Sequence, residues 1–297
     1  MAKKDGLINS RITGIIFSAA GREKWQERRL MSRKMYKKRN PPEQGVHGLH
    51  RFFIAGESVQ GKKVVMAEQQ AQQIRNVLRI GDGEHIIVLD NQGWEYEVVL
   101  TAVRRSEVTG QVVEKRQAMG EPDTQITLYQ SLLKREKFEW VLQKCTEVGV
   151  GRFVPVITER SLIRSLDAVK ADKMERWRRI ITEAAEQSRR GRVPELALPV
   201  KFEQCMAALE GFDCLLMPSA KAEGVSLRAA LAGGERDKPS TIALFIGPEG
   251  GFTEKEMELG RASGAVAVSL GRRILRTETA AVVAASLILY ESGEMDG

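Results

Sequence analysis

The sequence predicts an α/β protein in which a small β-rich part precedes a larger part of alternating strands and helices. Up to about residue 115, short runs of alternating apolar and polar residues, interrupted by Gly-rich turns, predict antiparallel strands. From about residue 122, apolar strand-like runs alternate with amphipathic helical segments. Such repeated units form a mostly parallel sheet with helices on both faces.

The excess of positive charge lies at the start of the chain. Residues 1–46 contain 12 Lys and Arg against 4 Asp and Glu, a net charge of +8, whereas the remaining 34 and 35 give −1. A basic segment without hydrophobic periodicity is typical of a disordered arm, and some such arms add salt-dependent affinity for nucleic acid. A solvated tail, or a true start at Met31 or Met35, explains the segment more simply than a specific RNA-binding arm. We therefore predict a basic, disordered extension over residues 1–48.

The composition argues against several classes of protein. No apolar run approaches the roughly 18 residues of a membrane helix, and no signal-peptide pattern is present at the N-terminus, so we expect a soluble, cytoplasmic protein without a membrane partner. The cysteines and histidines show no disulfide framework or zinc-ligand spacing, and we expect no metal. These residues are Cys145, Cys205, Cys214, His47, His50 and His85.

Residues 50–115 are predicted to form a small β-barrel or sandwich. The turns Gly-Asp-Gly and Asn-Gln-Gly separate its strands, and "MAEQQAQQIRNVLRIGDG" adds a short helix. Ile74, Val77 and Leu78 are spaced to face inward from that helix. Small barrels of this kind commonly bind RNA, although a fold alone does not determine a function.

The larger part predicts strands at "ITLYQSLL", "FVPVIT", "DCLLMP", "TIALFIG" and "AVAVSL". Its helices carry apolar stripes at helical spacing, and the clearest stripes contain Phe138, Val141, Leu142, Cys145 and Val148, then Met174, Trp177, Ile181 and Ala184. In parallel sheets of this type, ligands bind beyond the carboxyl ends of the strands. The loops that follow those strands are therefore the candidates for the functional site.

One candidate is the turn "GPEGG", residues 247–251, which follows an apolar strand. It lacks the Gly-Lys-Ser/Thr ending of a phosphate loop, and a carboxylate at Glu249 disfavours a bound phosphate. Backbone without side chains would let a flat ligand approach closely, although an isolated Gly-rich turn more often only reverses the chain. Thr253 and Glu256 predict a capping box at the start of the next helix.

The second candidate is the loop "LGRRILRTETA", which places Arg272, Arg273 and Arg276 before a very apolar helix. Clustered guanidinium groups are costly beside a core unless they are paired or face an anion, and they oppose the positive end of the helix dipole. Together they indicate a phosphate or carboxylate partner for this loop.

The motifs "IGPEGGFTEKE" and "SLGRRILRTETA" resemble those of the RsmE family of ribosomal RNA uridine methyltransferases, members of the SPOUT superfamily. The resemblance covers about residues 49–292. It implies a PUA-like RNA-binding β-barrel over residues 49–118, and a SPOUT α/β domain with a C-terminal trefoil knot over residues 122–293. It also implies S-adenosylmethionine (SAM) as cofactor, a homodimer, and methylation of uridine N3 in small-subunit (16S) ribosomal RNA, either free or in the assembled subunit.

The resemblance assigns residues to two groups, and the chemistry expected at the arginine loop suggests a third, catalytic group. The cofactor group comprises Met217, Ile246, Gly247, Pro248, Glu249, Gly250, Gly251, Leu270, Gly271, Ile274, Leu275 and Thr279. The group expected to line an RNA cleft comprises Arg51, Arg75, Arg79, Lys134, Arg135, Lys137, Gln187 and Arg190. The catalytic group comprises Arg276, Glu278 and Arg273.

The expected catalysis concerns the imide of uracil, which is protonated near neutral pH. Lowering its pKa by about two units requires about 2.7 kcal/mol of preferential stabilisation of the anion, which one or two charged hydrogen bonds supply. Arg276 is the first choice for that role and Arg273 the second. Glu278 either accepts the proton, or orients Arg276, or is a favourable acid in the first turn of a helix. The alternatives for the whole chain are a SPOUT methyltransferase acting on another RNA, such as transfer RNA, and a non-catalytic RNA-binding protein of ribosome assembly.

Overall fold

The computed structural model describes residues 48–134, 136–220, 225–232 and 239–295. The chain divides into two units, Met1–Leu49 and His50–Gly297, and the structure described below is that of the second unit. Apart from Gly48, the predicted basic extension lies outside the described residues.

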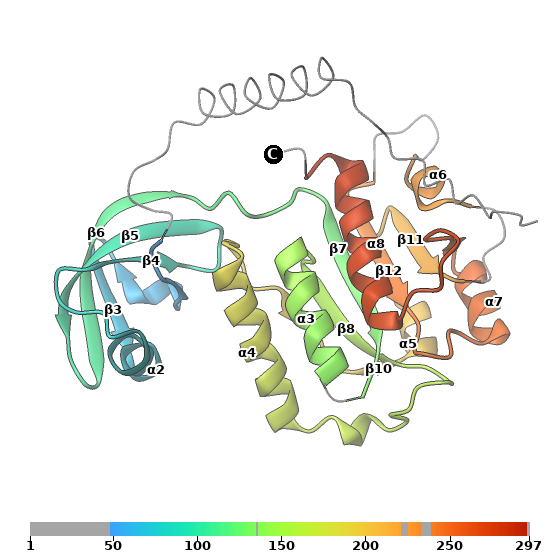
Figure 1. Cartoon of the computed structure of the whole chain (residues 1–297), viewed down its shortest axis with the longest axis horizontal. Coiled ribbons are helices and arrows are strands. Elements are labelled where there is room, and N and C mark those ends of the chain that lie inside the picture. Colours follow the sequence, from blue (N-terminus) through green and yellow to red (C-terminus); the bar gives the residue numbers. More distant parts are fainter. Residues whose placement is uncertain (1–47, 135, 221–224, 233–238, 296–297) are drawn as a thin grey trace, which may run out of the picture. The chain divides into compact units, whose positions relative to one another are not determined.

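The first sheet of the described chain has six strands in the order β1-β4-β5-β6-β3-β2. Figure 1 labels β3, β4, β5 and β6 of this sheet. All neighbours pair antiparallel except β1 and β4, which are parallel. The prediction of antiparallel strands in this region is thus largely confirmed. The elements are β1 (Arg51–Phe53), η1 (Gly56–Ser58), β2 (Val59–Gln60), β3 (Lys63–Ala67), α2 (Glu68–Gln72), η2 (Gln73–Leu78), β4 (His85–Leu89), β5 (Trp94–Val103) and β6 (Glu107–Gln117).

The predicted short helix is present, but only part of its predicted inner face is correct. After α2 the chain continues in the π-helical turn η2, in which Ile74 is fully buried and Val77 is 72% exposed. The prediction that Val77 faces inward is wrong because a π-helix bonds each residue to the fifth one along, so the spacing of a regular α-helix no longer identifies one face. Leu78 is partly buried against the core of this sheet.

The second sheet is parallel throughout, as predicted, and has the order β10-β8-β7-β12-β11-β13, with β9 paired to β8. Its strands are β7 (Gln125–Ser131), β8 (Arg152–Ile157), β9 (Glu195–Leu196), β10 (Val200–Lys201), β11 (Cys214–Pro218), β12 (Thr241–Ile246) and β13 (Val266–Val268). The two-residue strands β9 and β10 were not predicted, since they are too short to show a period.

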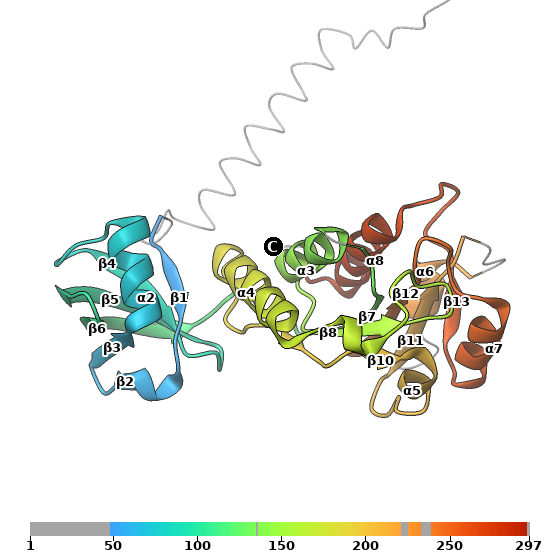
Figure 2. The ribbon, with the colours of Figure 1, turned by 90° about the horizontal axis from the view of Figure 1, so that it is seen from below.

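Helices cover both faces of this sheet (Figure 2). On one face, α3, α4 and α8 pack over a large apolar core, and the predicted stripes of α3 and α4 are buried there, with only Val148 partly exposed. On the other face, α5 and α7 cover a smaller core around Phe202 and Phe245. The helices are α3 (Glu136–Val148), η3 (Leu166–Ala168), α4 (Ala171–Gln187), α5 (Phe202–Met206), α6 (Leu227–Leu231), α7 (Glu254–Ala262) and α8 (Thr277–Ser292).

The central strand β12 pairs with β7 on one side and β11 on the other. Because all strands are parallel, the loops that follow β11, β12, β13 and β8 leave the sheet at the same edge. The turn at residues 247–251 and the loop at residues 270–276 therefore meet, as the sequence predicted. No helix in the described ranges is long and apolar enough to cross a membrane.

A carboxylate of α4 joins the second sheet's helical layer to the first sheet. Glu186 accepts a hydrogen bond from the backbone N–H of Phe53 in β1, with an N to Oε1 distance of 3.0 Å. Burial raises the pKa of Glu186 to about 7, against the smaller opposing effect of that hydrogen bond. The folded protein therefore binds a proton at Glu186 more tightly than the unfolded chain does.

We expect this group to destabilise the folded protein as the pH rises from about 4.5 to about 7, because ionisation is easier in the unfolded chain. Glu186→Gln keeps an oxygen acceptor for the N–H of Phe53. It should remove a pH-dependent loss in the free energy of unfolding on the order of 1–2 kcal/mol, after allowance for partial exposure. Urea unfolding at pH 5 and pH 8 measures the difference. Glu175→Gln, at an exposed position of α4, is the matched control. The same pH dependence in wild type and Glu186→Gln would contradict the prediction.

Candidate functional site

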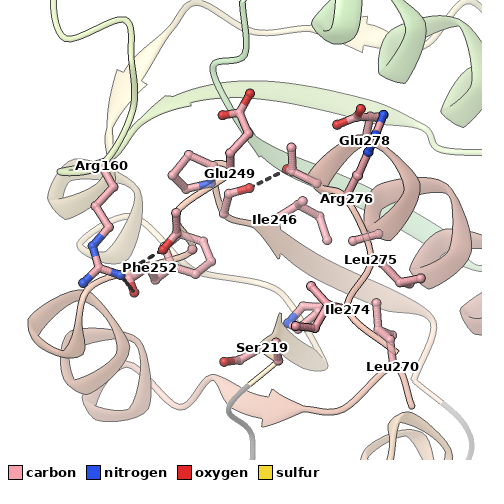
Figure 3. A pocket seen from close by; sticks show the side chains of 18 of the residues that line it. Arg160, Ser219, Ile246, Glu249, Phe252, Leu270, Ile274, Leu275, Arg276 and Glu278 are labelled. Carbon is pink, nitrogen blue, oxygen red and sulfur yellow. Dashed lines mark hydrogen bonds between the residues drawn. The ribbon is translucent and has the colours of Figure 1, made fainter. Parts of the chain in front are cut away.

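A pocket of about 520 Å³ opens at the carboxyl edge of the second sheet (Figure 3). Its volume is in the range of sites that bind small molecules and cofactors. The wall comes from the β12–α7 turn, the loop between β13 and α8, and the end of β11. The lining residues are Lys137, Arg160, Pro218, Ser219, Ala220, Ile246, Gly247, Pro248, Glu249, Gly250, Gly251, Phe252, Leu270, Gly271, Arg273, Ile274, Leu275, Arg276, Thr277, Glu278 and Ala280.

The glycines of the β12–α7 turn are required by its geometry. Gly251 has a φ of 66°, in the left-handed region that side chains disfavour, and its N–H donates to the carbonyl oxygen of Pro248 at 2.8 Å. A Cβ on Gly247 would lie 3.2 Å from atoms of Phe252. The turn thus exposes bare backbone to the pocket and does more than reverse the chain.

The predicted capping box at α7 is present and extends beyond the helix. Thr253 and Glu256 exchange hydrogen bonds between side chain and backbone. The buried Glu256 carboxylate also accepts a hydrogen bond from the N–H of Glu159, at 2.8 Å, in the loop that follows β8. One carboxylate therefore joins the β12–α7 turn to the β8 loop.

Thr277 joins the same turn to the start of α8. Its hydroxyl donates to the carbonyl oxygen of Gly247 at 2.5 Å and lies 3.4 Å from the Nε2 of Gln130, at the end of β7. Sequence reasoning missed this residue, because a threonine at the first position of a helix has no distinctive pattern. Its importance follows from a contact between segments that are far apart in the sequence.

The charged groups of the pocket have both signs. Lys137, from the first turn of α3, lies 3.3 Å from a carboxylate oxygen of Glu249 and 3.8 Å from one of Glu278. The other carboxylate oxygen of Glu278 is buried and has no hydrogen-bond partner among the described residues. Arg273 and Arg276 line the same pocket. The three residues predicted to be catalytic are therefore brought together.

Arg160 is a second pocket residue that sequence reasoning missed. Its Nη1 donates to the carbonyl oxygens of Gly250, at 2.9 Å, and Phe252, at 3.2 Å (Figure 3). The signal available was its place in the loop that follows the buried strand β8, which many surface arginines share.

Most of the residues predicted to bind a cofactor line the pocket, and two do not. Met217 is 1% exposed and packs its sulfur toward Gly260, so the prediction that it lines the pocket is wrong. The next residues, beginning with Pro218 and Ser219, line the pocket instead, because the wall starts where β11 ends. Thr279 lies on α8 outside the lining, whereas Thr277 and Ala280 belong to it.

The residues predicted to line an RNA cleft fall into different environments. Arg75, Arg79, Lys134 and Gln187 are exposed, Lys137 lies in the pocket, and Arg135 is outside the described residues. Arg51 was predicted to face RNA, but its side chain is only 10% exposed and is ion-paired with Glu95. Burial opposes ionisation of Glu95, but hydrogen bonds from Arg51 and Arg116 hold its pKa below the ordinary value.

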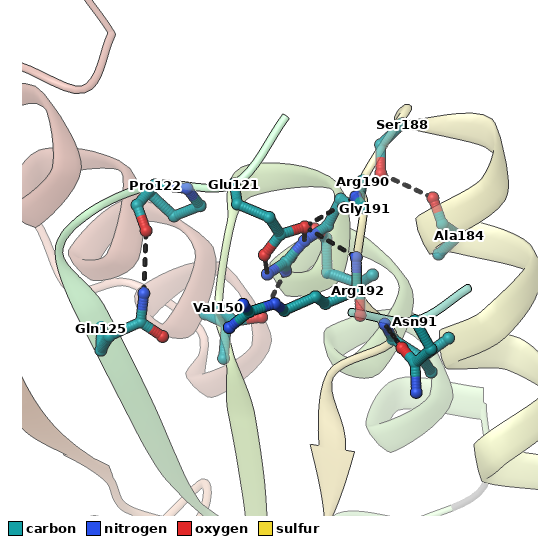
Figure 4. Close-up of polar contacts among 12 residues, drawn as sticks. Asn91, Glu121, Pro122, Gln125, Val150, Ala184, Ser188, Arg190, Gly191 and Arg192 are labelled. Carbon is teal, nitrogen blue, oxygen red and sulfur yellow. Dashed lines mark hydrogen bonds and ion pairs between the residues drawn. The ribbon is translucent and has the colours of Figure 1, made fainter. Parts of the chain in front are cut away.

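The prediction that Arg190 faces RNA is wrong, because its guanidinium is buried and each of its three nitrogens is hydrogen-bonded (Figure 4). Its Nη2 and Nε lie 2.8 and 3.1 Å from the two carboxylate oxygens of Glu121. Its Nη1 donates to the carbonyl oxygens of Thr146, at 3.3 Å, and Val150. Arg190 thus fastens the end of α4 to the chain around the first strand of the parallel sheet.

Comparison with known proteins assigns the chain to a class. The family model of the RNA methyltransferase domain matches residues 120–289. The ribosomal RNA small subunit methyltransferase E of Synechocystis sp. is 35% identical over 240 residues, which cover 80% of this chain and 77% of that protein. The protein of the same name from Bacillus subtilis is 34% identical over 232 residues, which cover 77% of this chain and 90% of that protein.

A solved structure extends the similarity to three dimensions. The ribosomal RNA small subunit methyltransferase E from Neisseria gonorrhoeae, bound to S-adenosyl methionine, matches with a TM-score of 0.71 and 29% identity, over 82% of this chain and 97% of that chain. The chain therefore belongs to the ribosomal RNA small subunit methyltransferase E (RsmE) family, as its motifs predicted.

We expect Thr277→Val to lower the free energy of unfolding by about 1–2 kcal/mol, because the carbonyl of Gly247 loses its buried partner while the side-chain shape is kept. The matched control is Thr279→Val on the same helical turn, which should change it by less than about 0.5 kcal/mol. Urea denaturation measures both. Equal losses in the two variants would contradict a specific role for the Thr277 hydroxyl.

Proposed function

We infer that this chain is an enzyme that transfers a methyl group from SAM to small-subunit ribosomal RNA. The observation that carries this conclusion is the bare-backbone pocket at residues 247–251 and 270–278, in a chain whose Neisseria relative is described as bound to SAM. A protein that only binds RNA has no need of such a backbone-lined pocket.

The residues of the pocket fit this cofactor. Apolar side chains at Ile246, Leu270 and Leu275 can enclose an adenosine, and the glycines let its flat base approach the backbone. The buried, unpartnered oxygen of Glu278 indicates a polar or charged group that completes the site. SAM supplies a methyl group on a positively charged sulfur, which is already a good electrophile.

We propose that the cofactor is held by the predicted residues that line the pocket, together with Pro218, Ser219 and Ala220 in place of Met217. The protein's remaining task is then to bind the RNA base, orient it and remove its proton. All three tasks fall to the charged side chains around the same pocket.

We propose uridine N3 as the methylated atom. Arg276 is the residue that stabilises the imide anion by charged hydrogen bonds, and Arg273 is the second choice. Glu278 accepts the imide proton through its unpartnered oxygen, while Lys137 lies 3.8 Å from the other oxygen. A carboxylate that is only a favourable acid at a helix start would not need a buried oxygen in this pocket.

We propose that residues 49–118 form a PUA-like barrel that binds RNA and that residues 122–293 form a SPOUT domain with a C-terminal trefoil knot. The return of the chain from the edge strand β13 to pack α8 against α3 supports the knot. Exposed apolar residues on α3 and α8, among them Trp140 and Tyr290, support a homodimer.

We propose that Arg75, Arg79, Lys134 and Gln187 contact the RNA, since these predicted residues are exposed. The target base must be unpaired or rotated out of its stack to reach the pocket. We place the reaction in the cytoplasm, where small ribosomal subunits are assembled.

Calorimetric titration with SAM, followed by mass analysis of ribosomal and transfer RNA after incubation, tests this function. SAM binding with methylated uridine in small-subunit RNA is the expected result. Methylation confined to transfer RNA would assign the enzyme to another substrate. Absence of SAM binding would favour a non-catalytic RNA-binding protein of ribosome assembly.

We expect Arg276→Ala to lower methylation by about 100-fold or more while changing the SAM dissociation constant by less than about threefold, because the lost hydrogen bonds act on the reacting base. Arg272→Ala removes the same charge from the same loop outside the pocket lining, and should retain most of the activity. Single-turnover methylation and calorimetry provide the two measurements. Near-wild-type turnover of Arg276→Ala would show that the assignment is wrong.

A further inference from the structure

The loop that follows β8 is held in place before it reaches the pocket. At residues 158–161 it forms a tight turn, in which the N–H of Ser161 donates to the carbonyl oxygen of Thr158 at 3.1 Å. The two buried hydroxyls of these residues lie 2.8 Å apart. The N–H of Glu159 is bound by Glu256 of α7. The backbone at Arg160 is thus anchored on both sides, and its side chain extends from a fixed point.

The Arg160 side chain lies directly on the β12–α7 turn. A Cβ on Gly250 would lie 3.3 Å from the Cδ of Arg160, so the aliphatic part of the arginine occupies the space that a side chain would need. The Nη1 at its end donates to the carbonyl oxygens of Gly250 and Phe252. The arginine therefore fits this turn through both its apolar and its charged parts.

The two carbonyls belong to peptide groups that are held at their other end as well. The N–H that shares a peptide with the Gly250 carbonyl belongs to Gly251 and donates to Pro248. The N–H that shares one with the Phe252 carbonyl belongs to Thr253 and donates to Glu256 at 2.7 Å. With Arg160 bound to their carbonyls, these two peptide groups are hydrogen-bonded at both ends. They are therefore held in one orientation, in a glycine-rich segment whose backbone would otherwise rotate easily.

We propose that Arg160 is a positioning residue that holds the Gly250–Phe252 backbone in the conformation that binds SAM, and that it sets the affinity for the cofactor more than the rate of methyl transfer. The proposal rests on the proposed function, in which this pocket binds SAM. A binding wall that is ordered in advance loses less conformational entropy when the ligand enters, and this gain appears as affinity.

The test compares Arg160→Gln, Arg160→Lys and the control Arg164→Gln in the full chain. Arg164 is an exposed arginine in the same connection that does not line the pocket, so its replacement removes the same charge. The SAM dissociation constant is measured by calorimetry, kcat at saturating SAM by methylation, and stability by thermal unfolding.

Arg160→Gln should weaken SAM binding about tenfold, with kcat within about threefold of wild type and a thermal midpoint within a few degrees. Arg160→Lys should be intermediate, because an ammonium group donates to the carbonyls without the planar geometry of a guanidinium. Arg164→Gln should bind SAM as wild type does. Unchanged affinity in Arg160→Gln, or an equal loss in Arg164→Gln, would overturn the proposal.

A double-mutant cycle with Gly250→Ala tests the contact itself. The added methyl group should displace the arginine and weaken SAM binding in wild type, but weaken it less when Arg160→Gln is already present. Additive losses would show that the two residues act independently and would overturn the proposal. The proposal would also be overturned if Arg160→Gln and Arg160→Lys both lowered the thermal midpoint enough to explain their weaker SAM binding.

Wild-type protein separates this proposal from the function on which it rests. Failure of wild type to bind SAM overturns both. Normal SAM binding by wild type and by both Arg160 variants overturns only the role of Arg160.

Discussion

The structure depends on holding a turn in which three of the five residues are glycine. The five residues Gly247–Gly251 expose backbone to the pocket, and such a segment is conformationally free unless other parts of the chain restrain it. Thr277 binds its first carbonyl, Arg160 binds the carbonyl of Gly250, and Lys137 pairs with Glu249. These side chains come from α8, the β8 loop and α3, which meet only because the strands are parallel. The shape of the pocket is therefore a property of the whole α/β domain.

The arginines show why charge alone does not identify a functional surface. Arg190 and Arg276 both lie next to the end of a helix in basic stretches of similar appearance. Arg190 is buried, and Glu121 and two backbone carbonyls satisfy its guanidinium, so its contribution is structural. Arg276 lines the pocket at an exposed position. The structural role of Arg190 and the pocket position of Arg276 are thus distinguished by the hydrogen-bond acceptors near each guanidinium. Those acceptors come from segments that are distant in the sequence.

The periodicity of the sequence predicted what depends on local geometry. The buried stripes of α3 and α4 and the parallel sheet follow from spacing alone, because a helix or strand of regular geometry buries residues at fixed intervals. The prediction for Val77 failed where a π-helical turn changed the interval. The prediction that Met217 lines the pocket failed because this residue lies in β11, one residue before the pocket wall begins. Arg160 could not be predicted because it contacts a carbonyl 90 residues away. The motifs located the site, but only the folded chain shows what holds it in place.

The position of β12 between β7 and β11 has a consequence for biosynthesis. Strand β7 ends at Ser131, but its partner on that side begins only at Thr241, so during translation one edge of β7 remains unpaired while more than a third of the protein is made. Pairing between such distant strands is slow, and unpaired apolar edges favour aggregation. The nascent chain thus carries an unpaired edge of β7 until the ribosome delivers the central strand.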